Sequence, residues 1–325
     1  MRKLLLSFAA ATLLLASCSK SDSSQKDELT TPESLSMSDQ RNCGAMEVLA
    51  ADMQNDPTLA QRMQEIEEFT AKAIRSRSMQ LAGTGIITIP VVVNVLYRTA
   101  SENISDAQIQ SQIDVLNEDF NGTNSDFTKT PAIFSGVAAN VGVQFTLAGV
   151  VRKYSSKRSW RTNNDMKSAA KGGIAATDPA NNLNIWVVND MGGILGYAQF
   201  PGGNASTDGV VIAHKYMGRI GTATSPYNLG RTATHEVGHW MNLRHIWGDA
   251  TCGNDQVADT PQHNTSNGGC PAYPHYSTCT GTPVEMTMNY MDYTYDACMY
   301  MFSNGQKDRM LAVFATGGPR ASFAN

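Results

Sequence analysis

The residues from position 235 to position 245 have types and a spacing that suit metal chemistry. They read HEVGHWMNLRH, with histidines at 235, 239 and 245 and a glutamate at 236. A helix brings His235 and His239 to one face, where both imidazoles can bind the same metal ion. Glu236 lies beside them and can take a proton from metal-bound water. Three neutral imidazoles and one open position form a catalytic zinc site, so the pattern predicts a zinc peptidase.

His245 can complete this site only if the helix stops and the chain folds back. The alternative interpretation is a helix whose histidines are ordinary polar groups. With six histidines in 325 residues, an H-E-x-x-H pattern arises by chance in roughly three in a thousand chains, which favours the metal site. A structural zinc site is disfavoured because a fourth protein ligand, usually cysteine, closes such sites. The histidines without a motif are predicted not to be ligands: His214, His263 and His275.

Regular elements must hold these residues in place. Residues 86–97 (IITIPVVVNVLY) predict a strand that is buried on both faces, and residues 231–243 are expected to form the helix with the first two histidines. Ser105 and Gln108 form a capping box that opens another helix. Further strands are expected at 143–151, 184–189, 194–200 and 209–214, and further helices at 46–79, with Pro57 near a start, and at 303–314. Residues 248–283 predict an irregular region that disulfides or an ion must order.

Overall composition excludes some classes of function. The formal net charge is −4, with 17% charged and 42% apolar residues, so nothing predicts a nucleic-acid surface. Residues 1–3 carry positive charge and residues 4–15 are apolar but too short to span a bilayer. The LASC sequence at 15–18 resembles a bacterial lipoprotein signal, which predicts a signal peptide at 1–17 and lipid on Cys18. An ordinary secretory signal is the alternative, and either one exports the chain.

The cysteines fit an exported protein with a tethered body. Residues 19–38 are polar and predict a flexible tether, so that 18–38 links the lipid to the folded part. Cys43 stands alone in the N-terminal part, whereas four cysteines follow the histidines: Cys252, Cys270, Cys279 and Cys298. An oxidising compartment predicts two disulfides among these four, and their spacing leaves three connectivities open.

Several stretches together resemble the metzincin metalloproteases, and within them the ulilysin-like members of the pappalysin family. They are HEVGHWMNLRHIWGD (235–249), CGNDQVADTP (252–261), MNYMDYTYDACMYMFSNGQ (288–306), ILGYAQFPGG (194–203) and RNCGAMEVL (41–49). The resemblance implies an α+β fold with a twisted, mostly parallel five-stranded sheet, an active-site helix and an irregular, disulfide-bonded C-terminal subdomain. A mainly helical pro-segment at 39–82 would precede a catalytic domain at 83–325, divided near residue 245. A catalytically silent cell-surface binding protein on the same fold is the alternative.

The resemblance also implies roles for residues beyond the histidines. Met291 matches the family's Met-turn below the metal, with Met288 as a competing candidate, and Tyr293 matches the tyrosine that stabilises the tetrahedral intermediate. The usual pattern has glycine where this chain has Asn242, and asparagine tolerates the positive φ that the turn needs. Asp296 matches the base of a pocket that accepts Arg or Lys, which predicts cleavage on the N-terminal side of these residues.

Substrate and inhibitor are both expected to reach this cleft. An extended protein or peptide substrate would pair with the edge strand through Leu195, Gly196, Tyr197 and Ala198. The RNCG sequence resembles a cysteine switch, in which the Cys43 thiolate takes the fourth zinc position and keeps the zymogen latent. Arg75 and Arg77 suit self-cleavage near residues 76–77, and the mature enzyme would act at the outer membrane or cell surface.

Two further features follow from the resemblance alone. It implies the disulfide pairs Cys252–Cys279 and Cys270–Cys298. It also implies structural calcium in the irregular region, for which the candidate oxygen ligands are Asp249, Asp255, Asp259 and Thr260.

Overall fold

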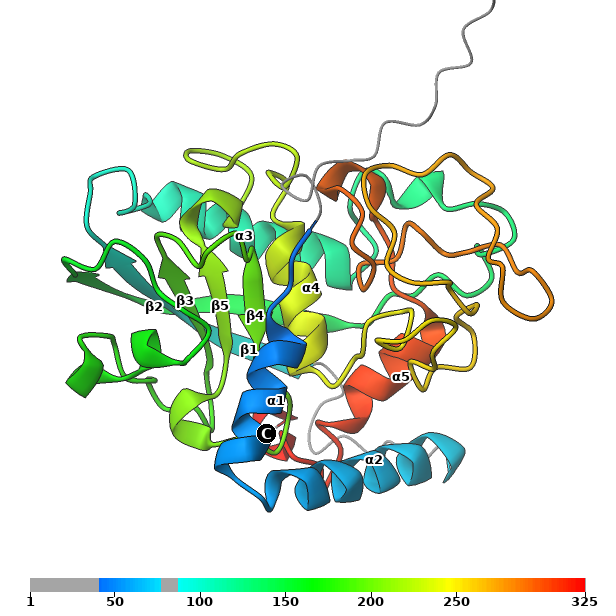
Figure 1. Cartoon of the computed structure of the whole chain (residues 1–325), viewed down its shortest axis with the longest axis horizontal. Helices are drawn as coiled ribbons and strands as arrows, with labels where there is room; N and C mark the ends of the chain where they lie inside the picture. The colour runs from blue at the N-terminus through cyan, green and yellow to red at the C-terminus, as the bar shows by residue number, and fades with distance from the viewer. Residues whose placement is uncertain (1–40, 77–86, 325) are drawn as a thin grey trace, which may run out of the picture. The chain divides into compact units, whose positions relative to one another are not determined.

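A five-stranded sheet forms the frame of the computed structural model, which describes residues 41–76 and 87–324 (Figure 1). The strands are β1 (Ile87–Tyr97), β2 (Val143–Tyr154), β3 (Leu183–Val188), β4 (Gly196–Ala198) and β5 (Val210–Ala213). Their order is β2-β1-β3-β5-β4, with only β4 antiparallel to its neighbour. The prediction of a mostly parallel five-stranded sheet is confirmed, and β4 is an edge strand.

Side chains on the two faces of the sheet pack into separate apolar clusters. In β3, Ile185 and Val187 pack with α3 (Asp106–Phe120) and α4 (Arg231–Trp240), whereas Trp186 and Val188 pack on the opposite side with Trp160 and Met166. Alternate residues of a strand point to opposite faces, so both sets are buried at once. The apolar runs in β1 and β3 therefore reflect burial on both sides, as predicted for residues 86–97.

The start of α3 differs in one detail from the expected capping box. The Ser105 hydroxyl caps the helix by accepting from the Gln108 backbone N–H at 3.1 Å. The Gln108 side chain does not return the bond, because its amide donates to the Met217 carbonyl at 2.9 Å and holds the loop after β5. A reciprocal capping box occurs instead at Ser303 and Gln306, where α5 (Asn304–Ala312) begins.

The N-terminal segment, residues 41–76, forms two helices. These are α1 (Ala45–Asn55) and α2 (Leu59–Ser76), so the helical pattern predicted for 46–79 is divided at Pro57. Proline suits the first turn of a helix but interrupts one that is already running. Helix α1 passes in front of β4 and α4, and α2 lies against α5 (Figure 1).

The region after α4 has little regular structure, as predicted. Two disulfides, Cys252–Cys279 and Cys270–Cys298, cross-link it, and they are the pairs that the resemblance implied. Short 3₁₀ helices occur at Phe127–Lys129, Asp165–Lys167, Ala169–Lys171, Ala205–Thr207, His214–Tyr216, Asp296–Cys298 and Ala321–Ala324. Cross-links that close long loops compensate for the missing hydrogen-bond ladders.

Some predictions concern residues that the structure does not describe. The signal peptide, the tether, Cys18, Arg77 and the boundary at 82/83 all lie outside the described residues. Within residues 41–76 and 87–324, no helix is both long and apolar enough to cross a bilayer. The strand expected at 194–200 is shorter than predicted, because β4 covers only Gly196–Ala198, and the helix expected at 231–243 ends at Trp240.

Candidate active site

Three histidines converge at the C-terminal end of α4. The Nε2 atoms of His235 and His239 lie 3.2 Å apart, and those of His239 and His245 lie 3.1 Å apart. Helix α4 supplies the first two. Asn242, with φ at 73°, then turns the chain so that His245 returns to the cluster. Glycine, which the family usually has at this position, adopts such a left-handed conformation freely. Asparagine is the next most tolerant residue, and Asn242 adopts the same conformation here.

Each imidazole is fixed by a hydrogen bond on its outer nitrogen. The three Nδ1 atoms lie 2.7, 2.8 and 2.5 Å from the Tyr290 carbonyl, the Leu243 carbonyl and Asp249 Oδ1. An Nδ1–H that donates outward leaves the Nε2 lone pair facing the centre. Burial, followed by the charge of the neighbouring imidazoles, lowers the pKa of His235 far below its usual range and that of His239 to about 3. Three neutral nitrogens that face one another without a proton between them fit a bound cation.

The surroundings of His245 make it as rigid as the two helical ligands. The Trp247 ring stacks on the His245 ring at 4.3 Å with an interplanar angle of 9°. Tyr293 packs edge-on against both rings, at 5.0 Å and 4.6 Å. Below the cluster, Met291 is fully buried, and a Cβ on Gly238 would lie 2.6 Å from its sulfur. The close contact of Met291 with α4 is what a Met-turn requires, and Met288 has no such contact with Gly238.

Cys43 belongs to the same cluster, although it lies 192 positions before His235. Its Sγ and one ring nitrogen from each of the three histidines all lie within 4.8 Å of one another. Its Sγ also lies 3.4 Å from Glu236 Oε2. Burial, and then the Glu236 carboxylate, raise the pKa of the thiol, whereas a bound cation would favour the thiolate. The four side chains therefore form a group that could hold a metal ion, with the ligand types of a closed zinc site.

Glu236 follows His235 in α4 and is buried. Burial raises its pKa to about 8. A Cβ on Gly196 would lie 3.0 Å from Glu236 Cγ, so glycine at this position lets β4 approach the carboxylate closely. Glu236 therefore lies close to both the edge strand and the histidines.

The N-terminal segment is paired with this edge strand. Cys43 forms a parallel β-bridge with Gly196. The Leu195 N–H donates to the Asn42 carbonyl at 2.9 Å, and the Gly44 N–H donates to the Gly196 carbonyl at 2.9 Å. Of the predicted edge-strand residues, Leu195 and Gly196 thus make backbone contacts across the cleft. Tyr197 and Ala198 are buried in the sheet, with the Tyr197 hydroxyl bonded to Asn164 at 3.0 Å on the far side.

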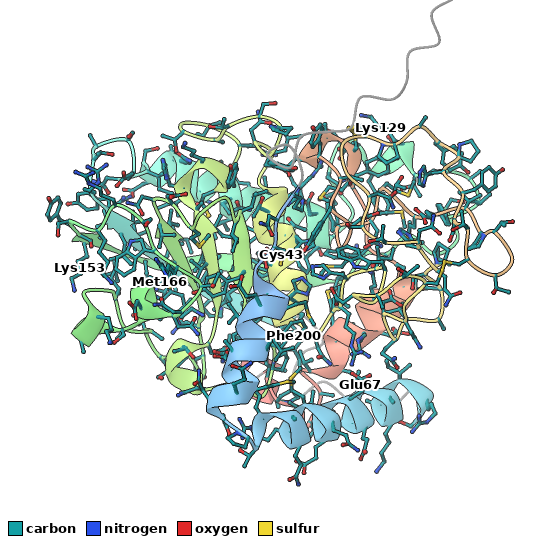
Figure 2. All side chains as sticks on the ribbon, in the orientation of Figure 1. Cys43, Glu67, Lys129, Lys153, Met166 and Phe200 are labelled. Carbon is teal, nitrogen blue, oxygen red and sulfur yellow. A yellow bond between two sulfur atoms is a disulfide. The ribbon has the colours of Figure 1, made fainter. Side chains whose placement is uncertain are left out.

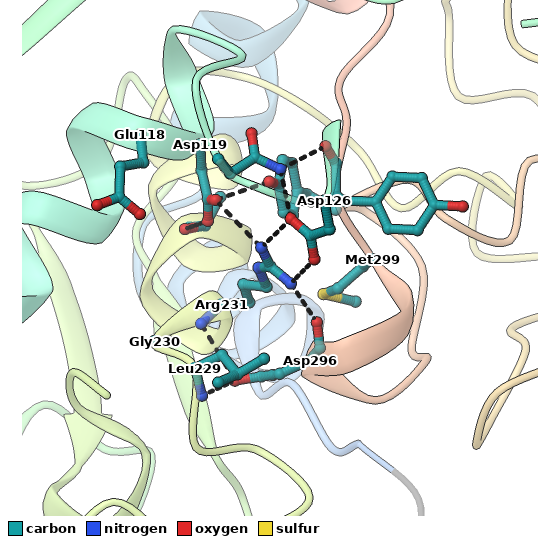
Figure 3. A network of polar contacts seen from close by, with 12 residues as sticks. Glu118, Asp119, Asp126, Leu229, Gly230, Arg231, Asp296 and Met299 are labelled. Atoms are coloured by element: carbon teal, nitrogen blue, oxygen red, sulfur yellow. Dashed lines mark hydrogen bonds and ion pairs between the residues drawn. The ribbon is translucent and has the colours of Figure 1, made fainter. Parts of the chain in front are cut away.

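Asp296 is buried and forms an ion pair with Arg41, two residues before Cys43. Arg41 Nη2 is 2.6 Å from Asp296 Oδ1, and both side chains are almost fully buried. The other oxygen, Oδ2, accepts the backbone N–H groups of Leu229 and Arg231 at 2.8 and 3.3 Å. Arg231 also donates to the Asp296 carbonyl at 2.6 Å and is itself paired with Asp126 (Figure 3). A built-in network therefore fixes one carboxylate oxygen and leaves the other for a cation.

The predicted calcium ligands do not converge in this structure. Asp249 contacts His245, Asp255 accepts from the Thr260 hydroxyl at 3.0 and 2.9 Å, and Asp259 accepts from Ser303 and Gly305 at the start of α5. Among the described residues, the one group of three or more such side chains that could hold a metal is Cys43 with the three histidines. Calcium stays a prediction. The histidines that are not members of this group are His214, His263 and His275.

Sequence reasoning missed three contributors to this site. Asp249 follows His245 by four residues, and Trp247 by two, and both support the third ligand. The short spacing of these two residues from His245 in HIWGD could have indicated that they contact its ring. Arg41 precedes Cys43 by two residues, but its pairing with Asp296 joins positions 255 residues apart, which no local pattern reveals.

Comparisons with known proteins agree with this geometry. Residues 173–315 match the peptidase family described as pregnancy-associated plasma protein-A. An extracellular metalloprotease of Arthroderma benhamiae is 34% identical over 257 residues, which cover 75% of this chain and 84% of the relative. One of Coccidioides posadasii is 35% identical over 242 residues, covering 70% and 77%.

Solved structures extend the match to the N-terminal segment. A promirolysin mutant of Tannerella forsythia is 43% identical, with a TM-score of 0.79, and covers 87% of this chain and 97% of that chain. Mature mirolysin of the same organism, in complex with a cleaved peptide, is 46% identical, with a TM-score of 0.72, and covers 74% and 96%. The proenzyme thus covers more of this chain than the mature enzyme does.

Proposed function

We propose a function from the premise that this chain belongs to the pregnancy-associated plasma protein-A, or pappalysin, family and is a metalloendopeptidase of the ulilysin-like metzincin type. The proposal is a zinc-dependent enzyme that cuts proteins on the N-terminal side of Arg or Lys and is made as a latent zymogen. The observation that carries it is the N-terminal segment in the cleft, with Cys43 beside the histidines and Arg41 on Asp296.

The catalytic steps follow from the groups around the histidines. Zinc bound by His235, His239 and His245 would polarise the scissile carbonyl and lower the pKa of a water molecule. Glu236 accepts the proton of the attacking water and later delivers it to the leaving amine, a role that its raised pKa of about 8 supports. The Tyr293 hydroxyl donates a hydrogen bond to the negative oxygen that develops on the substrate.

Substrate recognition uses the two features that the N-terminal segment now covers. An extended peptide pairs its backbone with Leu195 and Gly196, as Asn42 and Gly44 do in the latent form. Its basic side chain enters the pocket in front of Asp296, where a charge-assisted hydrogen bond in a buried setting favours a cation. The preference for a basic residue therefore rests on one carboxylate oxygen.

Latency results from the same contacts. A thiolate at the fourth zinc position excludes the attacking water, and Arg41 closes the pocket, so substrate cannot enter until the N-terminal segment is removed. Removal by the enzyme itself after residue 74 or 76 would fit its specificity, since Arg75 and Arg77 follow these bonds. Arg75 is exposed in the last turn of α2.

The proposal includes export. The curated relatives are described as extracellular, and the first seventeen residues read as a signal. Attachment of lipid to Cys18, and with it an anchor at the outer membrane, belongs to the proposal, since Cys18 lies outside the described residues. Labelling cells with a fatty-acid analogue tests it: wild type should be labelled and Cys18→Ser should not.

Digestion of a denatured protein by three matched zymogens tests the proposed activity. Freshly purified Cys43→Ala should begin to cut after a shorter lag than wild type, because the N-terminal segment has lost one of its anchors. The double variant Cys43→Ala/Glu236→Gln should cut at a rate about 10²–10⁴-fold lower. A chelator should stop all cleavage. A Cys43→Ala protein as latent as wild type would overturn the switch. No chelator-sensitive cleavage in any sample would leave the silent binding protein as the better description.

A further inference from the structure

Two arginines outside the N-terminal segment meet one carboxylate that belongs to it. Glu67 of α2 accepts from Nη1 and Nη2 of Arg309 at 2.6 and 2.5 Å, and its Oε2 lies 3.7 Å from Arg244 Nη2. Arg309 is in α5, and Arg244 directly precedes His245. Within the described part of the chain, no carboxylate other than Glu67 forms an ion pair with this arginine pair, Arg244 and Arg309.

Arg309 is fixed without the help of α2. Its side chain is only 2% exposed, and its Nε donates to the Asn242 carbonyl at 3.0 Å. That bond orients the guanidinium, so that both Nη atoms face the Glu67 carboxylate. A planar fork that meets a carboxylate at two points gives strong and directional charge-assisted hydrogen bonds. The arginine pair therefore forms a built anion site, and the N-terminal segment supplies the anion in the latent form.

Activation as proposed above separates the two halves of this site. A cut after residue 74 or 76 leaves Glu67 on the N-terminal segment, which departs, whereas α5 and the turn at Asn242 stay with the enzyme. A buried guanidinium that loses its carboxylate keeps an uncompensated charge, which is costly. The active enzyme therefore presents an arginine pair that no carboxylate of the N-terminal segment neutralises.

A cavity connects the arginine pair with the zinc ligands. Its volume is about 430 Å³. Residues from both sides line it, among them Glu67 from α2, and Phe200, Arg244 and Asp249 from the rest of the chain. The Phe200 ring lies 5.2 Å from the His239 ring, and Asp249 Oδ1 lies 2.5 Å from His245 Nδ1. The cavity thus extends from the histidines to Glu67, and the departure of α1 and α2 opens it to solvent.

The pairing of the N-terminal segment with β4 gives the direction in which a substrate meets this cavity. Cys43 forms a parallel bridge with Gly196 beside the histidines. The chain before Cys43 pairs with Leu195, whereas Phe200 follows the opposite end of β4. In the proposed function, Arg41 marks the place of the basic residue after the scissile bond. The substrate residues before that bond therefore extend toward Phe200 and the cavity.

We propose that the arginine pair binds an acidic side chain of the substrate, on the N-terminal side of the scissile bond. The inference rests on the proposed function, because it places the scissile bond at the histidines. A substrate glutamate or aspartate would accept from both Nη atoms of Arg309, as Glu67 does in the latent form. A glutamine has the same shape, but it carries no charge, and its amide N–H groups would face the guanidinium donors.

The test compares peptides that differ only in this side chain. All carry the same basic residue after the scissile bond, and either Glu or Gln at one of the positions before it. The activated protein digests each peptide at low salt, where charges are least screened, and kcat/KM is measured. We expect Glu to be favoured over Gln by about tenfold at one or two neighbouring positions, and to be accepted equally at the others.

Three variants assign the effect to the arginine pair. Arg309→Met removes the charge and should lower the Glu/Gln ratio to about one, whereas Arg244→Gln, at the more exposed member, should lower it about twofold. Arg98→Gln is the matched control and should keep the wild-type ratio, because Arg98 is 39% exposed beside Glu102 and Arg244 is 41% exposed. The ratio compares two peptides with one enzyme, so a general loss of activity cancels.

Two results would contradict the acidic subsite while the proposed function stands. The first is an equal kcat/KM for the Glu and Gln peptides at every position. The second is a wild-type ratio in Arg309→Met or, should that protein not fold, in Arg244→Gln. Cleavage of none of the peptides would overturn both the subsite and the proposed function.

Discussion

The third histidine depends on two residues that do not touch the metal position. Trp247 stacks on the His245 ring, and Asp249 Oδ1 lies 2.5 Å from its Nδ1. His235 and His239 are held by a helix, but His245 lies in an irregular stretch after it. The stack and the carboxylate replace that helix, because they fix the tilt and the tautomer of the ring.

Removal of the Asp249 carboxylate should therefore weaken zinc binding. We expect Asp249→Ala to lower the affinity for zinc by about 10- to 100-fold, as for other outer partners of ligating histidines. Titration of the protein against a zinc chelator measures this affinity. If zinc affinity is unchanged and calcium no longer stabilises the variant against heat, Asp249 acts as the calcium ligand that the family resemblance implied.

Tyr293 should affect catalysis more than binding. Its ring is already packed against His245 and Trp247, so Tyr293→Phe keeps the packing and removes only the hydroxyl. The loss of one donor to the developing oxyanion should lower kcat by about 10²–10³-fold with little change in KM. Steady-state kinetics on one basic peptide measures both. A larger change in KM than in kcat would show that the hydroxyl binds the ground state instead.

At the scale of single residues, the sequence predicts which side chains could bind a metal better than it predicts which side chains contact one another. His235, His239 and Glu236 follow from helical spacing, and Cys43 from its isolation and its motif. The contact of Arg41 with Asp296 could not be predicted in this way, because both residues have many alternative partners until the chain is folded. Asp249 is predicted as a calcium ligand because a carboxylate in a loop fits several kinds of site. Its contact with the His245 ring is visible only in the fold.

At the scale of elements, α2 is a second anchor for the N-terminal segment. Figure 2 labels Glu67 on this helix. Glu67 accepts from both terminal nitrogens of Arg309, at 2.6 and 2.5 Å, and lies 3.7 Å from Arg244. Arg309 also donates to the Asn242 carbonyl at 3.0 Å. Helix α2 thus contacts the turn that returns His245 to the site, which links docking of this helix to the metal ligands.

Neutralising Glu67 should loosen the latent form. Burial raises the pKa of Glu67, but the hydrogen bonds and charge of Arg309 outweigh it and keep the pKa low. A carboxylate whose pKa is lowered by folding stabilises the folded form at any pH above its unfolded pKa. This stabilisation is lost as pH falls through the folded pKa. We expect Glu67→Gln to expose the Cys43 thiol several-fold faster at neutral pH, as measured with a thiol reagent. Glu65→Gln, at an exposed position on the same helix, is the control and should behave as wild type.

Low pH should have the same effect on wild type as the Glu67→Gln substitution, because it protonates the Glu67 carboxylate. Wild-type thiol exposure should rise as pH falls below the usual pKa range of a glutamate, while Glu67→Gln should change less over the same range. Identical pH profiles for the two proteins would show that Glu67 does not hold α2 in place.

Strong local patterns determined most elements, and long-range contacts determined their ends. The run from 86 to 97 predicts β1 almost to the residue, because β-branched side chains suit a strand buried on both faces. The pattern at 194–200 exceeded β4 by several residues, since only Gly196–Ala198 finds a partner in β5. Gln108 fits the sequence pattern of a capping box, but its side-chain amide donates to the Met217 carbonyl instead. This competing contact cannot be predicted from the sequence of the helix alone.

At the scale of the whole molecule, the cleft is assembled from four distant parts of the chain. Four parts meet around the histidines: the N-terminal segment, the edge strand β4, helix α4, and the loop with Tyr293 and Asp296. The two disulfides hold the last of these, where regular structure is scarce. Motif recognition identified each part separately. The path of the N-terminal segment through the cleft became visible only in the fold.

Mapping of new N-termini tests the central claim most directly. The activated protein would digest a denatured proteome, and mass spectrometry would identify each new N-terminus, with a chelator and Glu236→Gln as parallel controls. The proposed activity predicts new termini that begin with Arg or Lys and that are absent from both controls. New termini without a basic first residue, or cleavage that persists with the chelator or in Glu236→Gln, would contradict it.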